Sequence, residues 1–172
     1  MSPKQRLLIG AIVLIMAASG FAVGRALMRP SKIIDQPIAF NHQKHVDDVG
    51  IECEVCHEHY NTSEHSGLPT LEACLFCHEE PVTELPEEEK IRELASEGRL
   101  DVFCKRFRLP DNVFYSHRRH VALAKLPCET CHGEIAATTT PPGEPLIRMT
   151  MDFCIECHEK QGVSESCTSC HR

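Results

Sequence analysis

The sequence has few of the residues that usually build a protein core. It contains no Trp, 2 Tyr and 7 Phe in 172 residues. From Ser31 onward, only 36 of 142 residues are Leu, Ile, Val, Phe, Met or Tyr, which is little for a compact domain. Side chains alone therefore do not supply an adequate core, and another apolar group has to fill the interior.

The body of the chain also lacks a basic surface. Residues 31–172 carry 14 Lys and Arg against 25 Asp and Glu, a formal charge of −11. Because nucleic-acid binding requires a basic face that neutralises phosphates, this balance excludes a nucleic-acid partner. The basic group Lys105, Arg106 and Arg108 is too short to reverse it, and we expect it to be solvated or locally ion-paired.

The N-terminal region lacks acidic residues altogether. Its uncharged apolar run, residues 7–24, lies between Arg6 and Arg25 and, at about 1.5 Å per residue, nearly crosses a hydrocarbon core of about 30 Å. An uncleaved membrane anchor is the favoured interpretation. A cleaved signal peptide is the alternative: its apolar part is usually shorter, about 7–15 residues, but Gly20-Phe21-Ala22 has the small-x-small pattern of a cleavage site.

Cysteine, in contrast, is abundant and regularly spaced. Ten of the eleven cysteines fall in five Cys-x-x-Cys-His motifs, and only Cys104 lies outside them. Zinc ribbons and disulfide frameworks also use closely spaced cysteines, but neither needs a histidine directly after the second one. Covalent haem attachment needs two thiols for the vinyl groups and that histidine for the iron.

The motifs therefore predict five covalently bound c-type haems. The predicted attachment residues are Cys53, Cys56, Cys74, Cys77, Cys128, Cys131, Cys154, Cys157, Cys167 and Cys170. The predicted proximal ligands are His57, His78, His132, His158 and His171. Because c-type haem is attached outside the cytoplasm, the body of the chain is expected to be exported.

Five haems would also replace the missing core, because the porphyrins themselves are apolar. We therefore expect a mostly irregular fold with short α-helices, a multihaem cytochrome c with an N-terminal transmembrane helix. Without haem, this body should not fold.

Four further histidines occur in two matched pairs, His42/His45 and His117/His120. Each pair follows an aromatic residue by two positions and ends eight positions before the next haem motif. The i and i+3 spacing places both imidazoles on one side of a helical turn, from which they can reach different irons. We predict that all four are distal ligands.

The matched pairs also show an internal repeat with an offset of 75 residues. The expected organisation is an anchor or signal peptide (1–30) and a pentahaem domain (31–172) made of a first repeat (40–78), a connector (79–109), a second repeat (115–158) and a C-terminal fifth motif (167–171). Pro86, the acids that follow it and Gly98 predict a short helix in the connector. Residues 138–145 read as a loop with no chemistry to assign.

One haem still lacks a sixth ligand. The candidates are His59, His65, Met149 and Met151, and a vacant position is a further alternative. His59 follows its own haem motif by two residues, His65 lies in a polar loop, and buried methionine usually fills space. The residues by themselves leave this choice open.

The Phe-x-His-x-x-His pattern before Cys-x-x-Cys-His resembles class III cytochromes of the c3 and c7 type, in which the two histidines ligate different haems. A closer resemblance extends over residues 38–172, to the multihaem subunits of alternative complex III and of the periplasmic quinone reductase complex. It is carried, in order, by FNHQKHVDDVGIECEVCHEHY, SGLPTLEACLFCHEE, LPDNVFYSHRRHV, CETCHGEI, PLIRMTMDFCIECHE and CTSCHR.

The resemblance implies an electron-transfer subunit, not an enzyme in itself, in the bacterial inner membrane. It would have a single N-terminal anchor in the lipid bilayer and a periplasmic haem domain. Its partners would be the membrane subunits of a quinol-oxidising respiratory or photosynthetic complex and a periplasmic electron acceptor. The alternatives are a stand-alone membrane-anchored quinol dehydrogenase and a multihaem reductase with one vacant haem site.

The sequence departs from these families at several positions. Phe103 and Phe107 stand where a Trp and a following His are expected, so the role of that histidine cannot be carried over. Phe153 replaces a second Trp. Cys104 takes an aliphatic position, so we expect it to be a small buried hydrophobe. Met151 matches a family methionine and is the first choice for the missing sixth ligand.

Overall fold

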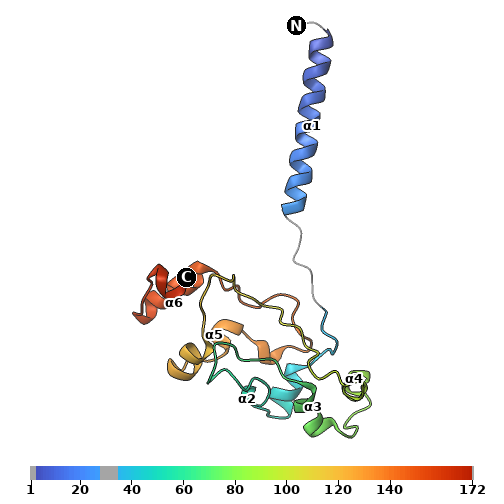
Figure 1. Ribbon diagram of the computed structural model, residues 1–172, viewed down its shortest axis with the longest axis vertical. Coiled ribbons are helices and arrows are strands. Elements are labelled where there is room, and N and C mark those ends of the chain that lie inside the picture. Colours follow the sequence, from blue (N-terminus) through green and yellow to red (C-terminus); the bar gives the residue numbers. More distant parts are fainter. Residues whose placement is uncertain (1–2, 28–34, 172) are drawn as a thin grey trace. The chain divides into compact units, whose positions relative to one another are not determined.

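The computed structural model describes residues 3–27 and 35–171, which belong to two compact units, residues 1–33 and 34–172 (Figure 1). The expected boundary between residues 30 and 31 lies outside the described residues, as does the basic Arg29.

The first unit is a single helix, α1 (Pro3–Leu27). Within it, Pro3–Phe21 has a mean hydropathy of 1.4 over 19 residues, and none of that stretch is buried against other protein. It is the one described helix that is long and apolar enough to cross a membrane. A signal sequence satisfies the same test of length and composition, so both interpretations of the N-terminal region remain.

The second unit is mostly irregular chain with short helices, and its described residues form no strand. Its helices are η1 (Lys44–Asp48), α2 (Cys53–Cys56), α3 (Leu71–His78), α4 (Pro86–Ser96), η2 (Arg118–Leu123), α5 (Glu129–His132), η3 (Ile135–Ala137), α6 (Met151–Gln161) and α7 (Cys167–Cys170). The expected fold class is confirmed.

An aliphatic core exists only where α3 and α4 pack together. The described core consists of Ile38, Leu71, Ile91 and Val102, each less than a tenth exposed. The amide of Leu71 donates to the carbonyl of Leu100 at 2.9 Å, which ties the start of α3 to the segment after α4. Four buried apolar side chains are few for a unit of this size, as the composition indicated.

The helix expected in the connector is present as α4. Pro86 occupies its first turn with three acids after it, a favourable arrangement because the helix dipole is positive at that end. Gly98, just beyond the helix, has φ +74°, a backbone conformation that suits glycine at helix ends. Ile91 faces the core, and so does the carboxylate-bearing Glu88.

Candidate haem-binding sites

Each Cys-x-x-Cys-His motif lies on a helical turn. Two motifs lie entirely within α3 and α6. The cysteines of the first and fifth motifs begin and end α2 and α7, each followed directly by its histidine, and Cys128 directly precedes α5. In three of them the histidine amide donates to the carbonyl of the first cysteine, at 2.9 Å for His57 and His132 and 2.8 Å for His171. A helical turn brings residues i and i+3 to the same face, so both sulfurs of a motif can meet one porphyrin edge.

The other uses of closely spaced cysteines find no support among the described residues. All eleven cysteines are free thiols, and the described residues contain no group of three or more side chains arranged to hold a metal ion. Burial raises the pKa of the Cys74 thiol to about 11 and also raises the pKa of Cys131 and Cys154.

The two His-x-x-His pairs lie at matching π-helical turns: His45 lies in η1 and His120 in η2, and His42 and His117 lie just before these turns. The amide of Val49 donates to Lys44 and the amide of Ala124 to Arg119, each at 3.1 Å and five residues back. Such π turns are rare and are often found at functional sites. The sequence predicted one helical turn at each pair but not its π character.

An aromatic ring supports each pair in the same way. The ring centroid of Phe40 lies 4.9 Å from that of His42 and 4.4 Å from that of His45. Tyr115 repeats this arrangement, at 4.9 Å from His117 and 4.6 Å from His120. The repeat seen in the sequence is therefore also a repeat in geometry.

Three of the four paired histidines face a histidine of a haem motif. The ring centroids are 6.1 Å apart for His45 and His78, 6.3 Å for His117 and His132, and 6.2 Å for His120 and His158. Two metal–nitrogen bonds of about 2 Å and two imidazole radii of about 1.1 Å give a similar separation. The spacing in each pair therefore fits one iron between the two rings.

The partner of the fourth paired histidine, His42, is inferred from the internal repeat. The position of His42 in the first repeat corresponds to His117 in the second, and His117 faces the histidine of the following motif. By analogy with His117 and His132, we expect His42 to face His57. The charge of His57, after burial, contributes to lowering the pKa of His42. Burial likewise lowers the pKa of His117 and His132, which favours the neutral form of these rings, the form that binds metals.

The outward-facing nitrogens of these rings are already used. Nδ1 donates to a backbone carbonyl in His45 (Asn41, 2.8 Å), His57 (Gly67, 3.0 Å), His117 (Glu64, 2.9 Å), His120 (Ser116, 2.9 Å) and His158 (Ser164, 2.8 Å). A carbonyl accepts only, so Nδ1 must carry the hydrogen and Nε2 keeps its lone pair. This is the arrangement that orients imidazoles toward a metal.

Thr138 has a role that the sequence did not reveal. Its hydroxyl donates to Ile135 O at 2.8 Å and accepts from Nδ1 of His42 at 3.1 Å. Its carbonyl accepts from the amide of Gln43 at 3.1 Å. The loop 138–145, to which we assigned no chemistry, therefore positions a predicted ligand of the first repeat.

The loop 61–67, which belongs to the first repeat, positions a predicted ligand of the second repeat. Its Glu64 carbonyl accepts from both the amide and Nδ1 of His117, at 3.0 and 2.9 Å. Gly67, whose carbonyl accepts from His57, has φ +80°, and a Cβ there would lie 3.1 Å from the His59 ring. Glycine is therefore required at this bend, and each repeat supplies a hydrogen-bond acceptor for the other.

The fifth motif is tied to the segment before the second repeat. The amide of Phe114 donates to Cys170 O at 2.7 Å, and Asn112 Nδ2 lies 3.4 Å from Nδ1 of His171. The candidates for its sixth ligand lie in different settings: His59 and His65 are exposed, Met149 is half-buried, and Met151 is the exposed first residue of α6. None of the four has a described ring or hydrogen-bond contact with His171, and the choice among them stays open.

The expectation for Cys104 is wrong. The side chain is exposed, because Val102 and Phe103 are the residues of this segment that pack into the core. The side chain of Gln36 binds the backbone of Cys104: its Oε1 accepts from the Cys104 amide at 2.9 Å, and its Nε2 donates to the Cys104 carbonyl at 2.7 Å.

The chain is similar to known multihaem proteins. The family model described as cytochrome c7 and related cytochrome c matches residues 113–172. Over 162 residues, the chain is 30% identical to the multihaem cytochrome c subunit of menaquinone reductase from Nitratidesulfovibrio vulgaris, covering 80% of this chain and 77% of the relative.

Proposed function

The chain belongs to the family of multihaem c-type cytochromes that are subunits of membrane quinone reductase complexes, and we propose that it is the haem relay of such a complex. Five haems bound to the five Cys-x-x-Cys-His motifs would carry electrons between membrane subunits that react with quinone and a soluble redox partner in the periplasm. The chain itself would not be the catalyst of the quinone reaction.

The observation that supports this proposal best is the set of facing histidines. Each of the three pairs joins a histidine of a haem motif to one of a His-x-x-His turn, 6.1–6.3 Å apart. Bound haem supplies one-electron chemistry at its iron. The role of this chain would be to hold one imidazole on either side of the iron in four of the five haems. Backbone carbonyls accept from the outward nitrogens of His45, His57, His117, His120 and His158.

The predicted ligand set assigns His57 with His42, His78 with His45, His132 with His117, and His158 with His120. His171 would bind the fifth haem, for which Met151 is the preferred sixth ligand. A thioether ligand would raise the reduction potential of that haem relative to the bis-histidine haems, so the C-terminal haem would be the site most easily reduced.

Helix α1 is proposed to be an uncleaved membrane anchor. Its span Pro3–Phe21 is apolar and unburied within the protein, and c-type haem attachment places the remainder in the periplasm. N-terminal sequencing of the mature protein distinguishes this from a cleaved signal: an anchor leaves the residues before Arg6 in place.

The direction of electron flow has two candidates. We propose quinol oxidation, with electrons leaving toward a periplasmic acceptor. The relative is a menaquinone reductase by name, which favours the reverse direction as the second candidate. In native membranes, addition of a menaquinol analogue should reduce the haems if the first is correct. Reduced periplasmic donor should reduce them, and added menaquinone reoxidise them, if the second is correct.

Purification in mild detergent tests the assignment to a complex. The chain should co-purify with integral membrane subunits and with covalent haem in a ratio of five per chain. If it migrates alone and oxidises quinol unaided, it is a stand-alone dehydrogenase. A high-spin haem that binds small oxyanions would instead support the reductase alternative.

A further inference from the structure

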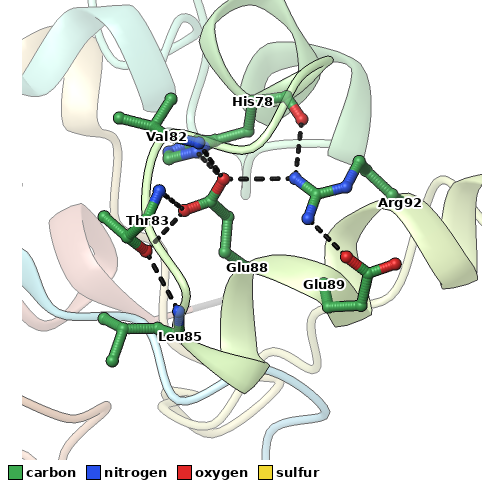
Figure 2. Close-up of polar contacts among 7 residues, drawn as sticks. All are labelled: His78, Val82, Thr83, Leu85, Glu88, Glu89 and Arg92. Carbon is green, nitrogen blue, oxygen red and sulfur yellow. Dashed lines mark hydrogen bonds and ion pairs between the residues drawn. The ribbon is translucent and has the colours of Figure 1, made fainter.

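Glu88 is a buried carboxylate beside the second haem motif. It is 5% exposed, on the face of α4 that packs against α3. The amide of Val82 donates to Oε1 at 2.6 Å, and the amide and hydroxyl of Thr83 donate to Oε2 at 2.8 and 2.6 Å (Figure 2). A buried carboxylate with this many donors is stabilised in its charged form, and these bonds, with Arg92, hold the pKa of Glu88 well below its usual range.

Arg92 joins this carboxylate to the haem motif. Its Nη1 donates to Glu88 Oε1 at 3.1 Å and lies 3.4 Å from the His78 carbonyl oxygen (Figure 2). Its Nη2 donates to the exposed Glu89 at 2.5 Å. One guanidinium thus faces two carboxylates, and the group as a whole retains a negative charge.

The Glu88 carboxylate lies beside the outward nitrogen of His78. Nδ1 of His78 is fully buried, makes no hydrogen bond of good geometry, and lies 3.4 Å from Glu88 Oε1. When Nε2 binds a metal, Nδ1 carries the hydrogen, and a buried N–H needs an acceptor. Glu88 is the group placed to accept it.

The corresponding histidine of the second repeat has a different partner. Nδ1 of His158 donates to the carbonyl of Ser164 at 2.8 Å. A neutral carbonyl accepts a weaker hydrogen bond from Nδ1–H than a carboxylate does. A carboxylate partner therefore raises the basicity of a ligating histidine more than a carbonyl does. The two repeats therefore differ in the strength of one proximal ligand, although the spacing of their histidine pairs is nearly the same.

We propose that Glu88 is a positioning residue that lowers the reduction potential of the haem bound by His78 below that of the haem bound by His158. A more basic imidazole and a nearby negative charge both stabilise the oxidised iron. The inference rests on the proposed function, because it requires haem at His78. It assigns the first repeat the more reducing of the two corresponding haems.

Glu88→Gln in the full chain, purified with its haems from membranes in detergent, is the main test. It removes the charge but keeps the shape of the side chain. In a redox titration followed by the α-band, about one fifth of the amplitude should move to a higher midpoint potential, and the other haems should not move. The paramagnetic resonance signal of one low-spin haem should change with it.

Glu93→Gln is the matched control, since it removes the same charge from an exposed position on the same helix. It should leave every midpoint unchanged. Equal shifts in both variants would mean that only the net charge of the domain matters, and the proposal would be wrong. An unshifted Glu88→Gln titration with all haems present would also overturn it.

Arg92→Gln keeps the proposal testable if Glu88→Gln fails to assemble. Removing this cation leaves Glu88 less neutralised, so the same fraction of the amplitude should move to a lower midpoint, opposite to the effect of Glu88→Gln. No shift, or a shift upward, would contradict the proposal. A haem content below five per chain in the unmodified protein would instead refute the proposed function on which it rests.

Discussion

The first repeat (40–78) and the second (115–158) place their histidines almost identically but surround them differently. In both, an aromatic ring lies 4.9 Å from the first histidine of the pair and 4.4–4.6 Å from the second. Yet among the described residues, the first repeat alone packs against α4 and contributes to an aliphatic core. The difference teaches that ligand placement is encoded locally, in a few residues of each turn, whereas the environment of each haem comes from the rest of the fold.

The largest effect is expected from removing what both repeats share. When the chain is expressed without haem attachment, residues 34–172 should remain unfolded, because only four apolar side chains are buried in the described core. Circular dichroism and limited proteolysis check this. A cooperative unfolding transition in the haem-free chain would show that the side chains suffice.

Loss of one distal ligand should affect the two repeats equally. His45→Ala and His120→Ala each remove one member of a facing pair, so each should convert one haem from low-spin to high-spin iron. Paramagnetic resonance measures the fraction converted. His59→Ala is the control and should leave the spectrum unchanged; a high-spin signal there would make His59 the missing sixth ligand.

Substitutions at corresponding positions of the two repeats should differ in their effect on the free energy of unfolding, because only the first repeat has a described aliphatic core. Leu71 and Met151 each stand three residues before the first cysteine of a haem motif, but Leu71 is 0% exposed and Met151 is 63% exposed. Leu71→Ala should lower the free energy of unfolding by about 2–5 kcal/mol, measured by denaturant titration. Similar costs at both positions would mean that the second repeat has a packed core as well.

Met151→Ala should have a small effect on stability and a specific effect on one haem. Met151 is 63% exposed, so the packing lost with its side chain is worth less than about 0.5 kcal/mol, and any larger loss would measure its bond to iron. Because Met151 is the preferred sixth ligand, however, its removal should convert one haem to high-spin iron. An entirely low-spin spectrum excludes it, and Met149→Ala is then the variant to measure.

The smallest effect is expected where the repeats are made more alike. Tyr115→Phe gives the second pair the ring that Phe40 gives the first. Burial raises the pKa of Tyr115 to about 12, so its hydroxyl is neutral and the ring is the part that supports His117 and His120. The midpoints and the spin state should stay unchanged in redox and paramagnetic titrations. A displaced midpoint would show that the hydroxyl contributes to the second repeat.

Much of this arrangement could be predicted because it depends on local spacing. The helical turn of each motif and the helix at Pro86 follow from short-range patterns, and the structure contains them. Helix α6 has similar signals, a Thr150 hydroxyl that accepts from the Phe153 amide and Gly162 at φ +64°.

The acceptors of the ligand histidines could not be predicted. Most are backbone carbonyls, of Gly67, Glu64 and Ser164 among others, and a carbonyl is present in every residue type. Glu88 reads as one of three consecutive acids in the first turn of a helix. Only the packing of α4 against α3 distinguishes it from its exposed neighbour Glu89.

The exchange of acceptors between the repeats has a consequence for how this chain can be divided. Glu64 serves His117 and Thr138 serves His42, so neither duplicate carries a complete set of groups for its own histidines. A fragment ending before the second repeat would leave His42 without its hydroxyl partner. The two repeats therefore depend on each other and cannot be separated without leaving a predicted ligand histidine short of its hydrogen-bond partner.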